Sequence, residues 1–132
     1  MYKFATILLI QVLCGMEMDL FIPSFPELQK VFNLTPVMVQ MTLSVNFVVF
    51  CICSLFAGAL GDKYNRRMIL ILGLWIFVIG SLICVTAPNY FLLILGRILQ
   101  GAGISAPAIL SFPVLLEDYS AEKQPGMMGM VN

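Results

Sequence analysis

The sequence predicts an all-α transmembrane protein with about four membrane-spanning helices, and three observations lead to this fold class. Hydrophobic residues make up 61% of the 132 residues and charged residues only 11%, whereas soluble domains are about half apolar and about a quarter charged. A chain this short has too little interior to hide so much apolar surface from water. Its apolar stretches are also long enough to cross a membrane, which takes about 20 residues each.

The first predicted span covers residues 4–22 and ends at Pro23. An alternative is a cleaved signal peptide or a lipid anchor, because Lys3 precedes the apolar run as a charged leader residue would. The acidic residues Glu17 and Asp19 follow the run, where a cleavage site would need small residues. A membrane-spanning helix therefore fits this segment better than a leader.

The other predicted spans cover residues 37–60, 68–87 and 90–116. The last of them contains a single basic residue, Arg97. Pro, Asn and charged residues lie in the breaks between the spans, as is typical of turns. Residues 117–132 are predicted to form a cytoplasmic tail, so that the whole chain is one helical bundle without a soluble domain.

The placement of Lys and Arg predicts the orientation, because both are enriched in the cytoplasmic loops of membrane proteins. One loop residue, Lys30, falls on the outer side. The basic residues predicted to lie on the inner side are Lys3, Lys63, Arg66, Arg67 and Lys123. We therefore expect a multi-pass protein of the inner or plasma membrane with both termini in the cytoplasm. The net charge of zero gives no argument for a nucleic-acid partner.

Three ionisable residues, Glu17, Asp19 and Arg97, lie within apolar segments, where a charge is costly and usually functional. At about 1.5 Å per residue, Asp19 and Arg97 fall at a similar depth in the outward half of the membrane. We expect these two to pair or to share a water-filled cavity. The alternatives are a purely structural ion pair, an arginine that reaches the membrane surface, or a first helix that ends early and leaves both acids in water. Glu17 is two residues from Asp19 and should face another side of the helix.

Asn46 lies near the middle of the second span, where it either contacts a substrate or hydrogen-bonds a neighbouring helix. The sequence has no His, and its four cysteines are all inside apolar runs: Cys14, Cys51, Cys53 and Cys84. We expect them to be apolar fillers without a disulfide, and we expect no metal site and no cofactor. Because no nucleophile and base stand in a catalytic pattern, the sequence does not predict an enzyme.

The short segment between the second and third spans is basic and rich in small residues. Gly58 and Gly61 would let the end of the second span approach a neighbouring helix closely. Asp62 precedes Arg66 by four residues, which suits an ion pair if the segment is helical. A simpler interpretation is a basic turn that sets the topology.

Four motifs resemble signatures of the major facilitator superfamily, each on the corresponding helix. The segment 58–67, GALGDKYNRR, is similar to the signature between helices 2 and 3. The segment 93–103, LILGRILQGAG, resembles the helix 4 signature of the drug/proton antiporters. The segments 19–26, DLFIPSFP, and 40–44, QMTLS, are similar to the end of helix 1 and the start of helix 2 in the bicyclomycin-resistance (Bcr/CflA) group.

The resemblance implies a proton-driven exporter of small drug-like compounds, whose partners are protons, the small molecule and the lipid bilayer. It associates Asp19 and Arg97 with the coupling of protons to substrate. It also associates a set of residues with gating on the cytoplasmic side: Gly58, Asp62, Arg66 and Arg67.

Asn46 and Gln100 are further candidates for a substrate cavity, and Gly101 and Gly103 are candidates for helix packing. Asn65 stands where the loop signature usually has Gly. Since Asn is the non-Gly residue that best tolerates a left-handed backbone, we expect the turn to survive.

The superfamily has about twelve helices, built from three-helix repeats, so this chain corresponds to one repeat and one further helix. It is therefore expected to be an N-terminal fragment or a truncated form of such a transporter, lacking the C-terminal helices. One alternative is a complete small four-helix exporter that acts as an oligomer, for which Glu17 would supply a membrane-embedded acid. Another is a membrane protein that does not transport.

Overall fold

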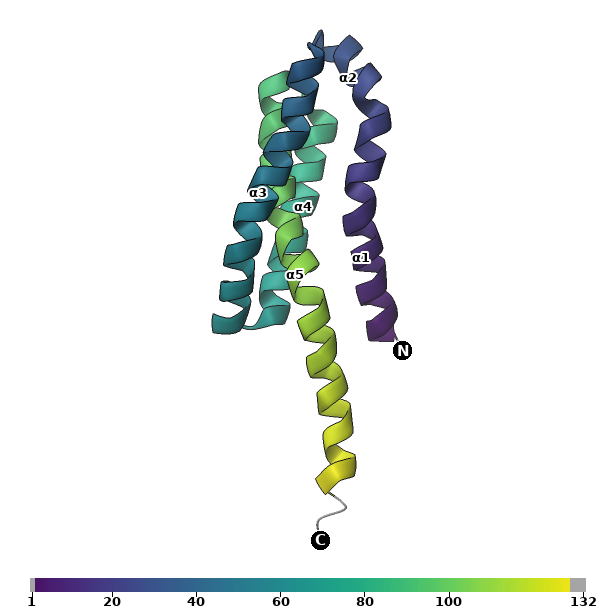
Figure 1. Ribbon diagram of the computed structural model, residues 1–132, viewed down its shortest axis with the longest axis vertical. Coiled ribbons are helices and arrows are strands. Elements are labelled where there is room, and N and C mark those ends of the chain that lie inside the picture. The colour runs from purple at the N-terminus through teal and green to yellow at the C-terminus, as the bar shows by residue number, and fades with distance from the viewer. Residues whose placement is uncertain (1, 129–132) are drawn as a thin grey trace.

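The computed structural model describes residues 2–128, and all of their regular secondary structure is helical (Figure 1). The elements in order are α1 (Tyr2–Phe21), the 3-10 turn η1 (Ile22–Ser24), α2 (Phe25–Phe32), α3 (Pro36–Lys63), α4 (Arg66–Thr86) and α5 (Tyr90–Met128). Within the described residues, four helical segments are long and apolar enough to cross a membrane: Phe4–Phe32, Pro36–Lys63, Arg66–Thr86 and Tyr90–Asp118. The predicted all-α fold with four spans is confirmed.

Helix α5 is the centre of the arrangement and packs against α4, α3 and α1. Figure 1 shows α3, α4 and α5 close together, with α1 to one side. The N-terminal end of α1, the turn between α3 and α4, and the C-terminal end of α5 all lie at the same end of the bundle. The spans therefore alternate in direction, as the distribution of basic residues requires. That this end faces the cytoplasm stays a prediction.

The first span ends in a more structured way than expected. Pro23 has no backbone N–H to continue the helix, and the chain passes through η1 into the short helix α2. Asn33 ends α2 with a left-handed backbone, at φ 51°, a conformation common just beyond helix ends. Part of the expected outer connection is therefore helical.

The turn between α3 and α4 is tighter than the sequence suggested. Helix α3 continues through Lys63, so that Asp62 is helical. Asn65 does not adopt the expected left-handed backbone, because its φ is −69°. It caps α4 instead, and its side-chain oxygen accepts a hydrogen bond from the Arg67 backbone N–H at 3.0 Å. Asn is among the preferred residues at this position.

Helix α5 does not end near residue 116, where a tail was expected to begin. It continues to Met128, so the segment 117–128 is helical. Glu, Ala, Lys and Gln residues in 117–124 favour a helix, and the helix continues through Pro125 and Gly126, which do not favour one. The loss of hydrophobicity marked the end of the apolar stretch, not the end of the helix. The remaining part of the predicted tail, 129–132, lies outside the described residues.

Glycines allow α4 and α5 to approach closely at two levels. A Cβ added to Gly73 would lie 2.7 Å from the Gly103 carbonyl oxygen. A Cβ added to Gly80 would lie 3.0 Å from the Gly96 carbonyl oxygen and 2.8 Å from the Gln100 nitrogen. These atoms are backbone and cannot move aside as a side chain can. Small residues at such contacts are typical of helix pairs in membranes.

Candidate functional site

A buried ion pair joins α1 to α5. The Glu17 Oε1 and Arg97 Nη1 atoms are 3.7 Å apart, and the two side chains are only 9% and 10% exposed. Two charges removed from water are costly unless they are paired and hydrogen-bonded. The exposed faces of the bundle are apolar, so this pair is the main concentration of charge inside the described part of the membrane-spanning segments. Its cost makes a functional role the default interpretation.

Two further side chains complete the surroundings of the pair. Asn46 of α3 is 3% exposed, and its Nδ2 donates a hydrogen bond to Glu17 Oε1 at 2.9 Å. The Arg97 guanidinium lies over the Phe21 ring, 3.5 Å from its centre. A cation over an aromatic face is stabilised by the charge distribution of the ring. Residues of α1, α3 and α5 thus meet at one carboxylate.

Gln100 lies one turn from Arg97 on α5 and is held by α4. Its Nε2 donates a hydrogen bond to Ser81 Oγ at 2.9 Å. The Cys84 thiol lies 3.5 Å from Gln100 Oε1. These contacts orient the amide beside the ion pair.

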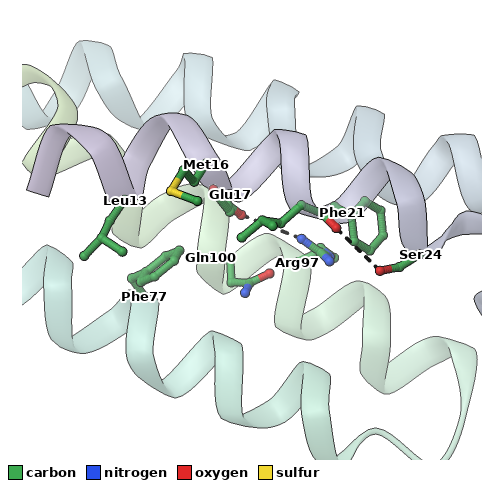
Figure 2. Close-up of a pocket in the computed structure, with 9 residues that line it drawn as sticks. Leu13, Met16, Glu17, Phe21, Ser24, Phe77, Arg97 and Gln100 are labelled. Carbon is green, nitrogen blue, oxygen red and sulfur yellow. Dashed lines mark hydrogen bonds and ion pairs between the residues drawn. The ribbon is translucent and has the colours of Figure 1, made fainter. Parts of the chain in front are cut away.

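The ion pair opens onto a cavity of about 420 Å³ between α1, α4 and α5. Figure 2 shows Glu17, Arg97 and Gln100 close to one another, with apolar and aromatic side chains on both sides of them. The lining residues are Leu13, Met16, Glu17, Leu20, Phe21, Ser24, Phe77, Arg97 and Gln100. A mainly apolar wall with a few converging polar groups is the usual make-up of a small-molecule site.

The structure brings together three of the predicted residues, Arg97, Asn46 and Gln100, but not Asp19. Asp19 is exposed and has no ion pair within the described part of the chain. Arg97 pairs with Glu17 and not with Asp19 as expected, and Asp19 does not line the cavity beside Arg97. Residues two apart on a helix differ by about 200° in direction, so only one of the two acids can face α5.

A second group of charges lies at the end of the bundle that holds the α3–α4 turn. The Arg66 guanidinium contacts Asp62 Oδ1 at 2.7 Å and Glu117 Oε1 at 2.9 Å. Arg67 forms an ion pair with Asp118. The predicted Asp62–Arg66 pair is present, and α5 supplies two acidic partners that the sequence did not reveal.

The glycines of this region behave differently from one another. A Cβ on Gly61 would lie 2.5 Å from the Leu110 side chain of α5, whereas a Cβ on Gly58 would have no neighbour within 4 Å among the described residues. The expected close approach therefore occurs at Gly61 and not at Gly58. Gly101 and Gly103 both lie at close helix contacts, Gly101 against Asn46 and Gly103 against Gly73.

The four cysteines are free thiols, and Cys51 is exposed rather than buried. Within residues 2–128, no group of three or more His, Cys, Asp or Glu side chains is placed to hold a metal ion.

Comparison with known proteins gives a consistent family. The sequence model of the Major Facilitator Superfamily matches residues 7–132. Over 115 residues the chain is 30% identical to the uncharacterized MFS-type transporter YdgK of Bacillus subtilis, covering 87% of this chain and 29% of that protein. It is 32% identical to YwfA, another uncharacterized MFS-type transporter of Bacillus subtilis, covering 89% of this chain and 28% of that protein.

A further similar protein is the multidrug resistance protein MdtL of Salmonella paratyphi B, which is 25% identical over 86% of this chain and 29% of its own length. The chain thus spans less than a third of the length of these relatives. No solved structure matches the chain.

Proposed function

The chain belongs to the major facilitator superfamily, and we propose that it forms the N-terminal part of a proton-coupled exporter of small drug-like molecules in the cell membrane. The described helices correspond to one three-helix repeat of the superfamily fold and the first helix of the next. Its similarity to a multidrug resistance protein supports export as the direction of transport. Helices beyond this chain would supply the rest of the substrate cavity.

The observation that carries the proposal is the Glu17–Arg97 pair at the edge of the cavity. Arg97 stays protonated under all conditions that proteins meet, so Glu17 is the member of the pair that can gain and lose a proton. When Glu17 is ionised, Arg97 and Asn46 both stabilise it. When Glu17 is protonated, the charge attraction to Arg97 is lost and the guanidinium becomes available to another acceptor. Proton binding and substrate binding are thereby linked through one side chain.

The cavity supports an amphipathic substrate. Its volume of about 420 Å³ lies within the range of about 300–1,000 Å³ that is typical of small-molecule sites. Phe21 and Phe77 offer aromatic surface, and Gln100 offers a polar contact beside them. Such a site selects by size and apolar character more than by a fixed pattern of hydrogen bonds.

The test is drug-dependent proton release from membrane vesicles that carry the transporter in its native length. We expect Glu17→Gln to abolish coupled release, because a neutral amide cannot exchange a proton. Asp19→Asn is the matched control, since it removes the neighbouring acid that faces away from Arg97. Normal coupling in Glu17→Gln, together with a loss in Asp19→Asn, would show that Asp19 is the coupling acid after all.

The proposed length has its own test. An antibody to residues of α2 would detect the protein in native membranes. We expect its mass to be roughly three times the 14.6 kDa of this chain, because the chain spans less than a third of its relatives. A band at the mass of this chain alone would contradict the proposal.

A further inference from the structure

Two nitrogen atoms that can donate hydrogen bonds lie near Glu17 Oε1, at different distances. The Asn46 Nδ2 atom is 2.9 Å away, whereas the Arg97 Nη1 atom is 3.7 Å away. Hydrogen bonds between a charged nitrogen donor and a carboxylate are usually about 2.7–2.9 Å long. The neutral amide, and not the guanidinium, is therefore in hydrogen-bonding contact with the carboxylate. It comes from α3, a helix to which α1 is otherwise barely connected.

The other end of the same amide is unsatisfied. Asn46 Oδ1 is buried and has no hydrogen-bond partner among the described residues. Gly101 of α5 lies against it, since a Cβ on Gly101 would be 3.0 Å from this oxygen. Glycine presents only C–H groups there and offers no side-chain donor. A buried acceptor without a partner costs free energy, so the position of this oxygen next to an ionisable group calls for an explanation.

We propose that Asn46 is a positioning residue that holds Glu17 in both of its protonation states. An amide side chain carries two N–H donors and one carbonyl acceptor, whereas an ionised carboxylate only accepts and a protonated one also donates. With Glu17 ionised, Nδ2 donates to it, as in this structure. With Glu17 protonated, rotation of the amide about its last bond brings Oδ1 to accept the new O–H. That bond has a broad, nearly two-fold preference, so both orientations are accessible.

Among the charged and titratable groups near Glu17, none can replace Asn46 as a strong acceptor for the protonated carboxyl group. The other charged or titratable groups facing Glu17 are Arg97 of α5, Cys84 of α4 and Cys14 of α1. Arg97 has no acceptor, so it cannot accept a hydrogen bond from the O–H of the protonated form. Thiols are weak donors and acceptors, and that of Cys84 already lies against Gln100. Glu17 and Asn46 also line a second cavity of about 250 Å³, which gives both side chains room to change partner.

The inference rests on the proposed function, in which Glu17 carries the proton, and infrared difference spectroscopy separates the two. The purified protein in lipid nanodiscs is taken from high to low pH, and the C=O stretch of the protonated carboxyl is recorded. Glu17→Gln identifies the band of Glu17 by its loss, and Asp19→Asn, which removes an exposed acid, should leave that band in place. In Asn46→Leu, which keeps the branched shape of the side chain but has neither donor nor acceptor, we expect the band to move to the higher frequency of an unbonded carboxyl group.

A Glu17 band at the same frequency in Asn46→Leu would overturn the inference and leave the proposed function standing. A spectrum without any Glu17 band at low pH would overturn both, because Glu17 would then take up no proton. If Asn46→Leu does not fold, Asn46→Val replaces it with the same expected shift and the same criterion.

Discussion

Replacing Gly101 by Ala would test whether the close contact of α3 and α5 positions the ion-pair site. The added Cβ would lie 2.5 Å from the Asn46 backbone oxygen, whereas ordinary van der Waals contact begins at 3.4 Å. The clash is with backbone, so the two helices would have to separate by about 0.9 Å, the difference between these distances. A shift of that size in α3 is enough to stretch the 2.9 Å hydrogen bond from Asn46 to Glu17 beyond bonding distance.

The magnitude follows from two opposing effects. Overfilling a packed contact costs about 1–3 kcal/mol, while exchanging Gly for Ala within a helix gains about 1 kcal/mol. We therefore expect Gly101→Ala to lower the free energy of unfolding by up to about 2 kcal/mol. Gly58→Ala is the matched control, because it makes the same exchange in α3 with no neighbour within 4 Å. It should raise stability by up to about 1 kcal/mol.

The measurement is reversible unfolding in mixed detergent micelles, followed by circular dichroism, for both variants and the unchanged protein. If Gly101→Ala proves as stable as Gly58→Ala, the contact between α3 and α5 is looser than the structure shows. The argument that Gly101 positions Asn46 would then fail as well.

Other outcomes are equally open to measurement. Arg97→Ala should abolish drug-dependent proton release, and Arg97→Lys should retain part of it because the charge is kept; equal activity in both would show that the charge is not needed. Asp62→Asn should slow transport without reducing the amount of protein in the membrane, since it removes one partner of Arg66; an unchanged transport rate would leave this segment a purely topological role. Reporter fusions should place Asn89 outside and Lys123 inside, and the reverse pattern would refute the orientation.

The four membrane-spanning helices were predictable because hydrophobicity over a span is a property of the sequence alone, whereas the short helix α2 was not predicted. The helix ends were less predictable. Helix α5 continues beyond its apolar part, where Glu, Ala, Lys and Gln residues of 117–124 favour a helix. The cap that Asn65 provides depends on how the chain leaves α3, which composition does not reveal.

The site was predicted only in part, and the reason is geometric. Arg97 was identified by its position in an apolar stretch, whereas the choice between Glu17 and Asp19 depends on the rotation of α1 about its own axis. That rotation is set by packing against α5, which brings Glu17 inward and leaves Asp19 exposed. Phe21 follows from the same rotation, because it lies one turn further along the face that Glu17 occupies. The spacing of four residues between Glu17 and Phe21 was the signal in the sequence that both lie on one face of α1.

The partners of the basic turn were missed for another reason. Glu117 and Asp118 are about fifty positions away from Arg66 and Arg67 in the chain, and only the antiparallel packing of α4 on α5 brings them together. Local spacing revealed the Asp62–Arg66 pair, which needs nothing but a helical backbone.

The paired glycines of α4 and α5 also limit how these two helices can slide. On each helix the two glycines are seven residues apart, Gly73 and Gly80 on one and Gly96 and Gly103 on the other, which corresponds to about two helical turns. A slip of one turn would bring side chains such as Ile76 or Leu99 to positions where only a hydrogen atom fits. These contacts oppose such a slip, so in the proposed transporter we expect α4 and α5 to move together as one element.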